Sequence, residues 1–412
     1  MIQQFCPNPG VWQRLYAGPL GAHLDTWAQQ LLQQGYASWT TKYTMRLLAD
    51  LSRWLQRYSL AVTDLHERHV DAFLQNRYRR CRAHRDDRSI LKRLLRQLRE
   101  HDVIPFPGVE TERDARTCLE DDFQHSLLQQ RGLAPTTVHA YLDTVRRFLS
   151  DRLTAQPLRL EALCAQDVTG FIVQQARRYR PAHAKLTATA LRSFLRFLLQ
   201  RGAIPNDLAQ AVPTVPNWRL SALPQFLKAE EVAGLLQSCD QRTPHGQRDY
   251  AILLLLARLG LRAGEVAALR LDDLDWDVGE LLVRSKGARY DRLPLPHAVG
   301  EALAAYLRTG RPPCPTRQVF VRMRAPHRGV ANGQAVSTLV HRALERAGLN
   351  PVRKGAHLLR HSLATQMLHH GASLVEIGEL LRHRTIETTR IYARVDQGAL
   401  RARALPWPGG AP

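Results

Sequence analysis

The chain has 412 residues, in which 58 Lys and Arg outweigh 37 Asp and Glu, so the formal net charge is +21. This excess favours a polyanionic partner, with nucleic acid ahead of an anionic membrane surface; a ribosomal or merely basic protein is the alternative. No run of roughly 20 apolar residues is present to cross a bilayer, and the opening MIQQFCPNPG lacks the charged and apolar regions of a secretory signal.

The length allows two or three domains, each with its own core. The six cysteines are scattered without a C-x-x-C pair. Their spacing argues against a zinc ribbon and against a disulfide framework, and it favours a reduced cytoplasmic compartment.

The first half of the chain contains an internal repeat. LLQQ occurs at 31–34 and again at 127–130, and Ile-Pro closes each copy at 104–105 and 204–205. The offset drifts from about 96 to 100 residues, as small loop insertions would produce. The other matches are Thr40-Thr41 with Thr136-Thr137, Leu65, Val70 and Phe73 with Leu163, Val168 and Phe171, and Leu91, Leu95, Arg96 and Leu98 with Leu191, Leu195, Arg196 and Leu198.

Apolar residues within each copy recur with helical spacing, so the repeat predicts two similar modules of four or five helices, over 1–110 and 117–213. Chance matching between Leu- and Arg-rich helices is the alternative. Both copies carry basic runs, which we expect to contact DNA phosphates rather than to be only a solvated face. The DNA-binding candidates are Arg77, Arg80, Arg177, Arg178, Arg180, Lys185 and Arg192, and the first run also contains Arg79, Arg82, Arg85, Arg88, Lys92 and Arg93.

A proline-punctuated linker over 214–226 separates these modules from the rest of the chain. The segment RDYAILLLLARLG then predicts a buried helix that ends at Gly260, and Arg262 follows directly. Next, GELLVRSKGARYDRLPLP alternates as a β-hairpin does, with Lys286-Gly287 at its turn. Helices and basic loops are expected from 296 to 349.

The stretch 357–392, HLLRHSLATQMLHHGASLVEIGELLRHRTIETTRIY, predicts three helices. Leu359, Leu363 and Met367 lie on one stripe of the first helix, which Gly371 ends. Ser373 and Glu376 form a capping box for the second helix. A short third helix is expected from near Thr385, carrying Tyr392.

The pattern H-x-x-R-H, then L-L-x-H, then T-T-x-I-Y resembles the catalytic signature of the tyrosine recombinases, the phage-integrase family. The residues around Arg262 resemble the family's first arginine motif, G-L-R-x-x-E-x-x-x-L, and Lys286 resembles its mobile catalytic lysine. The family usually has glycine before the late histidine, where this chain has Arg382. Arginine fits there at modest cost if its φ is negative, which would loosen the turn rather than the chemistry.

The resemblance implies a mainly α protein in which tandem helical DNA-binding modules precede a mixed α+β catalytic domain over 227–395. The second module resembles the family's core-binding domain, and the family clamps DNA between the two domains. The expected function is site-specific recombination or integration through a 3′-phosphotyrosyl intermediate. A mobile-element integrase is favoured over chromosome or plasmid dimer resolution because the first module exceeds the minimal two-domain organisation.

A phosphodiester placed among the predicted catalytic residues suggests a role for each of them. Two arginines can clamp the non-bridging oxygens, because the guanidinium fork matches phosphate geometry. His383 can donate a further hydrogen bond, and His357 is the candidate base for the phenol. Tyr392 suits the nucleophile because a covalent intermediate keeps the energy of the broken bond. The full set is Arg262, Lys286, His357, Arg360, His383 and Tyr392, with Lys286 resembling the general acid for the 5′-oxygen.

Other functions use the same residue types. His357 and His361 are spaced like metal ligands, but Leu358 stands where a zinc protease needs glutamate, so neither metal nor cofactor is expected. His361, His369 and His370 are interpreted as structural or DNA-adjacent. A type IB topoisomerase would relax DNA with the same kind of site, and a catalytically dead regulator would bind DNA without cleaving it.

The resemblance also implies partners. Exchange of two duplexes needs four cleavages, so one nucleophile per chain implies a tetramer on double-stranded DNA, formed by identical or related recombinases. The segment Val395–Leu405, in the tail that continues over 396–412, is expected to pack on a neighbouring subunit; a frayed terminus is the alternative. The expected location is the cytoplasm, at the nucleoid.

Overall fold

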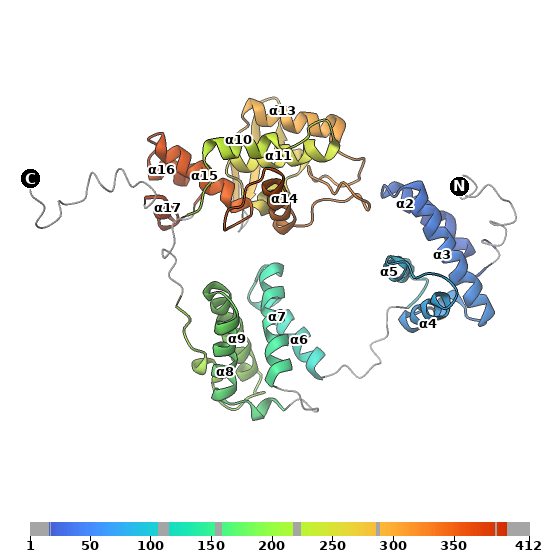
Figure 1. Ribbon diagram of the computed structural model, residues 1–412. Helices are drawn as coiled ribbons and strands as arrows, with labels where there is room; N and C mark the ends of the chain where they lie inside the picture. Colours follow the sequence, from blue (N-terminus) through green and yellow to red (C-terminus); the bar gives the residue numbers. More distant parts are fainter. Residues whose placement is uncertain are drawn as a thin grey trace, which may run out of the picture. The chain divides into compact units, whose positions relative to one another are not determined.

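The computed structural model describes residues 16, 18–105, 115–152, 159–216, 224–285, 289–383 and 385–393. These residues are mainly helical, with one small antiparallel sheet in the catalytic region, as the sequence predicted (Figure 1). Within the described ranges, no helix is both long enough and apolar enough to span a membrane.

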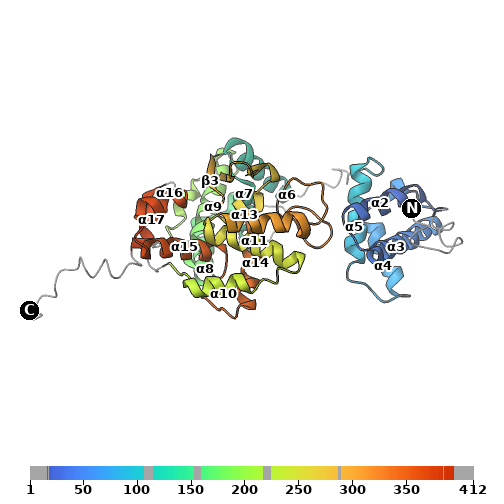
Figure 2. The same cartoon turned by 90° about the horizontal axis from the view of Figure 1, so that it is seen from above.

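The first module is a helical bundle (Figure 2). Leucine and aromatic side chains make up its core. Its elements are a 3₁₀ turn (Gly21–His23), α2 (Leu24–Gln33), α3 (Ser38–Arg57), a 3₁₀ turn (Val62–Asp64), α4 (Glu67–Tyr78) and α5 (Asp87–Glu100). Trp27, Leu51 and Leu91 are buried in its core. The apolar residues of α5 lie on one side, and Arg88, Lys92 and Arg96 are exposed on the opposite side.

The second module lies within a compact unit of its own, Pro105–Ser221. Its elements are α6 (Ala115–His125) with a following π-helical turn (Ser126–Gln130), α7 (Pro135–Arg152), a 3₁₀ turn (Leu160–Ala162), α8 (Ala165–Arg178), α9 (Pro181–Gln200) and a 3₁₀ turn (Leu208–Ala211). Its core contains two edge-to-face phenylalanine pairs, Phe123 with Phe194 and Phe148 with Phe171.

The two modules match in element order and in burial. In each, a long helix is followed by a 3₁₀ turn and then by two more helices. The paired apolar residues of the sequence repeat are buried in both: Leu65, Val70, Phe73, Leu91, Leu95, Leu98 and Ile104 in the first, and Leu163, Val168, Phe171, Leu191, Leu195, Leu198 and Ile204 in the second. The repeated sequence therefore accompanies a repeated structural arrangement.

The catalytic region is organised around α11 (Pro244–Arg258), the helix predicted from its apolar run. Residues 251–257 are buried on every side, because other helices surround it. The partners of α11 include α10 (Ala229–Gln237), α13 (His297–Ala305), α14 (Gly333–Arg346) and α15 (Ala356–His369). Short α12 (Ala263–Ala268) follows α11 and packs on α14.

The predicted hairpin is formed by β2 (Glu280–Ser285) and β3 (Arg289–Pro294), which pair antiparallel from Glu280↔Pro294 to Ser285↔Arg289. Lys286 and Gly287, the predicted turn, lie outside the described residues. A two-residue strand that the sequence analysis did not predict, β1 (Leu274–Asp275), adds to the other edge of β2.

The three carboxyl-terminal helices are α15, α16 (Leu374–Leu380) and α17 (Ile386–Ala393). Gly371, with φ +88°, follows the end of α15 as predicted. The predicted capping box is formed, because Ser373 Oγ accepts from the Glu376 N–H at 3.2 Å and Glu376 Oε2 accepts from the Ser373 N–H at 2.7 Å. Tyr392 lies on α17 and joins a small apolar cluster with α15 and α16. Residues 396–412 lie outside the described ranges.

Candidate active site

Arg262 lies at the turn between α11 and α12, two residues after Gly260, whose φ is +57°. Its backbone N–H donates to Glu265 Oε2 at 2.8 Å, and its guanidinium donates to Glu265 Oε1 at 2.7 Å. A third bond, of 3.2 Å, reaches the carbonyl oxygen of Arg382. Glu265 thus caps α12 and holds the guanidinium of Arg262 while the arginine side chain keeps 36% of its surface exposed.

Arg360 lies on α15 and is buried, with 4% of its surface exposed. It donates one hydrogen bond to the carbonyl of Gly260 and another to the carbonyl of Leu381. Burial first, and then the charges of Arg262 and Arg382, lower its pKa to about 10. The guanidinium therefore stays charged at neutral pH, although neutral carbonyl groups are its hydrogen-bond acceptors.

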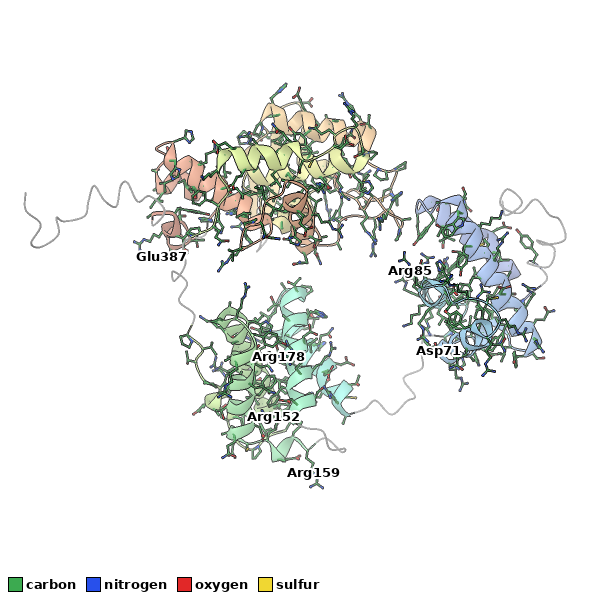
Figure 3. All side chains as sticks on the ribbon, viewed as in Figure 1. Asp71, Arg85, Arg152, Arg159, Arg178 and Glu387 are labelled. Atoms are coloured by element: carbon green, nitrogen blue, oxygen red, sulfur yellow. The ribbon has the colours of Figure 1, made fainter. Side chains whose placement is uncertain are left out.

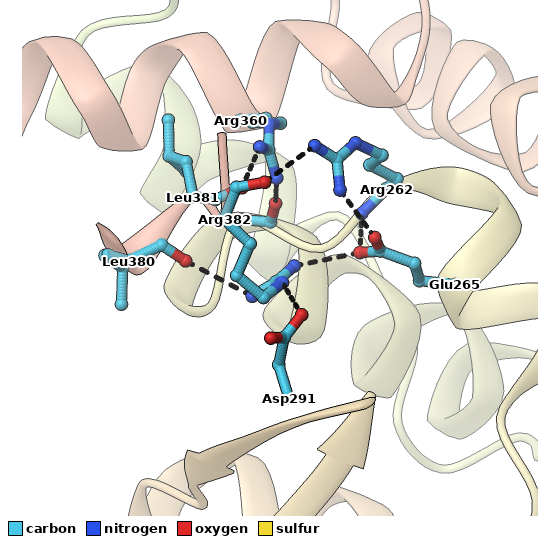
Figure 4. A network of polar contacts seen from close by, with 8 residues as sticks. Arg262, Glu265, Asp291, Arg360, Leu380, Leu381 and Arg382 are labelled. Carbon is cyan, nitrogen blue, oxygen red and sulfur yellow. Dashed lines mark hydrogen bonds and ion pairs between the residues drawn. The ribbon is translucent and has the colours of Figure 1, made fainter. Parts of the chain in front are cut away.

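Arg382 occupies the position where the family usually has glycine. Its φ is +53°, so the condition for a modest cost, a negative φ, is not met, and the backbone adopts the left-handed conformation that glycine favours. Its side chain donates to Glu265 at 2.8 Å, and its Nε lies 3.9 Å from a carboxylate oxygen of Asp291 on β3 (Figure 4). This buried ion pair offers a physical reason why arginine is tolerated there.

Burial raises the pKa of the Glu265 carboxyl, but hydrogen bonding from the backbone of Arg262 and the charges of Arg382 and Arg262 outweigh it, so the net pKa is lowered. The carboxylate therefore stays ionised between two arginines. Figure 4 shows the guanidinium of Arg360 next to this network. Three arginines against two carboxylates leave an excess of positive charge, which suits a phosphate.

Tyr392 is buried, with 1% of its surface exposed. Its hydroxyl oxygen lies 2.9 Å from Nδ1 of His361 on α15. The ring of His383 is stacked nearly parallel to the tyrosine ring, with centroids 6.4 Å apart. Thr389 Oγ1 lies 2.7 Å from Nδ1 of His383, which orients that imidazole from α17.

The protonation states of this cluster follow from burial and charge. Burial, with the nearby His357 and Arg360, lowers the pKa of His361 to about 4, while burial and the charges of Arg360 and Arg262 lower that of His383 to about 4. Burial raises the pKa of Tyr392 to about 12. At neutral pH both imidazoles and the phenol are uncharged, so His361 and Tyr392 share a hydrogen bond between neutral groups and the phenol keeps its proton.

The structure brings together Arg262, Arg360, His383 and Tyr392 from the predicted set. His357 lies one turn before His361 on α15, with ring centroids 6.4 Å apart, and its imidazole is exposed. Desolvation and the charges of Arg360 and Arg262 lower its pKa. The histidine within hydrogen-bond distance of Tyr392 is thus His361, whereas the sequence analysis proposed His357 as the base. Lys286 lies outside the described residues.

Two residues of this site received no catalytic role from the sequence. His361 follows His357 by four positions, a spacing that places both on one side of a helix, and this signal could have included it. Glu265 is the third residue after Arg262, the position of a capping carboxylate. What the sequence did not show is the cross-helix contact to Tyr392 or the contact to Arg382.

The predicted DNA-binding residues have different surroundings. Arg77 is half-buried and forms ion pairs with Asp50 and, at 3.7 Å, with Asp87. Arg80 is exposed. In the second module Arg192 donates to the carbonyl of Val212 at 2.9 Å, whereas the other predicted cations are exposed: Arg177, Arg178, Arg180 and Lys185.

Two family models match the chain. The phage integrase family model matches residues 225–398, which include every residue of the candidate site. The model of the phage integrase N-terminal SAM-like domain matches residues 121–202, within the second module. The first module precedes both matches.

Similar proteins are found along the whole length of the chain. A putative integrase/recombinase, y4rA, of Sinorhizobium fredii is 42% identical over 398 residues, 96% of each chain. A second, y4rF, from the same organism is 34% identical over 100% of this chain and 97% of its own. The tyrosine recombinase XerD of Listeria innocua is 32% identical over 67% of this chain and 94% of its own.

Solved structures share the fold. The XerH site-specific recombinase bound to its difH substrate, in a post-cleavage complex, matches with a TM-score of 0.52 at 19% identity, over 76% of this chain and 94% of that one. A lambda integrase (75–356) dimer bound to a core site matches with a TM-score of 0.50 at 20% identity, over 68% and 95%. Together with the matched family models and the full-length relatives, these findings show that the chain belongs to the phage-integrase family of tyrosine recombinases, enzymes that bind, cut and rejoin DNA.

Proposed function

We propose that this chain is the recombinase of a mobile genetic element and that Tyr392 is its nucleophile. The observation that carries the assignment of Tyr392 is its position on α17, stacked on His383 and hydrogen-bonded to His361, within the region matched by the integrase model. Two relatives described as putative integrase/recombinases match along the whole chain, whereas the relative described as XerD leaves about a third of it unmatched. This difference favours an integrase over a dimer resolvase.

The proposed chemistry uses the charges of the site. Arg262 and Arg360 bind the two non-bridging oxygens of a phosphodiester, where charge grows in the transition state. The oxygen of Tyr392 attacks phosphorus and forms the 3′-phosphotyrosyl bond, while the bond to the 5′-oxygen breaks. That oxygen receives a proton from a general acid, for which Lys286 is the proposal. Attack by a 5′-hydroxyl on the phosphotyrosine reverses these steps and rejoins a strand.

Before the attack, the tyrosine hydroxyl must leave its hydrogen bond with His361. The hydroxyl is buried in the structure, and a phosphodiester needs direct access to it. Because the pKa of His361 is about 4 and that of Tyr392 about 12, the proton remains on the phenol in this arrangement. We therefore assign His361 to holding the phenol and leave His357, on the exposed side of α15, as the proposed base once DNA is bound.

The covalent intermediate can be trapped directly. Incubation with a nicked duplex substrate in EDTA should give a protein–DNA adduct that survives denaturation. Tyr392→Phe should abolish this adduct, and Tyr290→Phe, which changes an exposed tyrosine of the same domain, should retain it. An adduct of normal yield with Tyr392→Phe would remove Tyr392 from the nucleophile's role.

The proposed assembly is a tetramer on two DNA sites, with the tail after Tyr392 linking protomers. A chain truncated after Ala393 should still bind one DNA site but lose cooperative assembly and coordinated cleavage. Analytical ultracentrifugation of protein–DNA complexes would measure the loss. Unchanged assembly and full recombination by the truncated chain would contradict this role of the tail.

A further inference from the structure

We propose that the first module carries its own binding surface for duplex DNA, formed by the loop between α4 and α5, the first turns of α5 and the start of α3. We name this surface, consisting of Arg79, Arg80, Arg82, Arg85, Lys92 and Trp39, the amino-terminal basic face. It would hold DNA phosphates beyond those reached by the second module and the catalytic domain. The inference rests on the proposed function, because the DNA is the recombination substrate.

The first observation is that the cations occur at matching places in the two modules. The shift that superposes the 3₁₀ turn Val62–Asp64 on Leu160–Ala162 also superposes Arg79, Arg80 and Arg82 on Arg177, Arg178 and Arg180. The shift that aligns Leu91 with Leu191 aligns Arg85 and Lys92 with Lys185 and Arg192. Basic residues therefore recur at aligned sequence positions in the module that matches the SAM-like domain model, where Arg177 and Arg178 end α8 and Lys185 lies in α9.

The second observation is exposure without neutralising partners. Arg79, Arg80, Arg82 and Lys92 are exposed, and among the described residues no carboxylate lies within ion-pair distance of them. Arg85, with 91% of its side chain exposed, stands clear of the helices (Figure 3), and among the described residues it forms one ion pair, with the exposed Asp86 at 3.8 Å. Exposed arginines that pair with no carboxylate are free to bind DNA phosphates.

Other basic residues of the same run are excluded by their contacts. Arg77 is held by Asp50 and Asp87, and Arg88 donates to Asp71 at 2.7 Å. These pairs lie at the two ends of the loop, since Arg77 is in the last turn of α4 and Arg88 is in the first turn of α5. The structure thus separates cations that hold the loop from cations that the loop presents to solvent.

The third observation is an exposed aromatic residue next to the loop. Trp39, near the start of α3, has 68% of its surface exposed and lies 6.2 Å from the ring of Tyr43. Tyr43 in turn packs 4.8 Å from the ring of His84, a residue of the loop, and donates to Asp87. Trp39 is therefore placed beside the cations, where its indole can pack against the sugars of a DNA backbone.

Duplex DNA fits this surface better than a protein does. A protein partner would need a matching cluster of carboxylates to neutralise these cations. A DNA backbone offers one phosphate after another to such a cluster, and release of its counterions favours binding. Because this surface belongs to the first module, we expect it to lengthen the protected DNA rather than to take part in cleavage.

The test uses the full-length chain and a matched pair of double variants. Arg80→Ala/Arg82→Ala removes two cations of the amino-terminal basic face. Arg68→Ala/Arg96→Ala removes two exposed arginines near the other ends of α4 and α5. Binding to a duplex containing the recombination site is measured over a range of salt concentrations, together with hydroxyl-radical footprints and yields of the Tyr392 adduct.

Log affinity falls linearly with log salt, with a slope of about −0.9 for each phosphate contact. The proposal predicts that Arg80→Ala/Arg82→Ala makes this slope less negative by about 2. It also predicts loss of protection on one flank, with core protection retained, and no such change in the control pair. A slope and footprint equal to those of the wild type would overturn it. So would an unchanged slope with lost association between protomers, which would identify a protein interface.

The two proposals fail in different ways. Absence of a Tyr392 adduct from the wild-type chain would refute the proposed chemistry. The difference in salt slope between the two double variants would still show whether the amino-terminal basic face binds DNA.

Discussion

Arg360 of the candidate active site and the arginines of the amino-terminal basic face have opposite surroundings. Arg360 has 4% of its surface exposed and donates to two backbone carbonyls, whereas Arg79, Arg80 and Arg82 are exposed and, among the described residues, have no carboxylate partner. The net charge of +21 adds these two populations together. The difference teaches that burial and hydrogen-bond geometry, rather than charge density along the sequence, separate candidates for chemistry from candidates for binding.

The comparison fails if an arginine of the candidate active site can be removed without slowing strand cleavage. Arg262→Ala and Arg360→Ala should each lower the rate of strand cleavage at saturating protein by about 100-fold or more, because each removes transition-state charge stabilisation. Single-turnover cleavage of a nicked substrate measures the rate. Arg258→Ala, at an exposed position at the end of α11, is the control. Wild-type cleavage by Arg360→Ala would contradict the assignment.

The role of Lys286, which lies outside the described residues, can be tested with a substrate that needs no general acid. If it is the general acid, Lys286→Ala should slow cleavage by about 100-fold on an ordinary substrate. A substrate with sulfur in place of the bridging 5′-oxygen needs no acid and should restore the rate. Arg360→Ala should stay slow on both substrates, and Lys228→Ala should stay fast on both. Loss of cleavage on both substrates would place Lys286 with the phosphate-binding residues instead.

The buried, neutral imidazoles of His361 and His383 make the stability of the catalytic region depend on pH. A histidine whose pKa falls from 6.5 in the unfolded chain to about 4 in the fold binds fewer protons when folded, so stability is present above pH 6.5 and is lost as pH falls towards 4. His361→Phe should reduce this acid loss. Hydrogen exchange of α15 to α17 at pH 7.5 and pH 5 measures it, with His139→Phe on the second module as control. An equal acid loss in His361→Phe would contradict the buried, neutral state.

The smallest effect concerns backbone strain at Arg382. At φ +53° a residue with a Cβ costs about 1 kcal/mol relative to glycine. Arg382→Gly and Arg382→Ala both lose the pair with Glu265, so their difference isolates the strain. The free energy of unfolding should be about 1 kcal/mol larger for Arg382→Gly than for Arg382→Ala in denaturant titrations. Equal values would show that the turn relaxes when the ion pair is gone.

Features within one helix or one hairpin were predictable from the sequence. The apolar run of α11, the Ser373 and Glu376 cap and the strand pairing of β2 with β3 depend on neighbours a few residues apart. Local periodicity and capping chemistry determine such features.

Features that join distant segments were not predictable in the same way. The hydrogen bond between His361 and Tyr392 links residues 31 positions apart, and the pair of Arg382 with Glu265 links residues 117 positions apart. The positive φ of Arg382 was not predictable, because the local sequence does not show the carboxylate of Glu265 with which its side chain pairs. The two-residue strand β1 is too short to leave a periodic signal.

The carbonyl of Gly260 bears on how such an enzyme can diversify. A main-chain acceptor cannot be substituted or protonated away, so the orientation of Arg360 is insulated from most changes to surrounding side chains. A Cβ at Gly260 would lie 2.6 Å from Cδ2 of Leu381 and would need a φ of +57°, so this position tolerates little variation. Related enzymes can therefore come to recognise new DNA sequences through changes in exposed residues, while the orientation of Arg360 toward the phosphate stays the same.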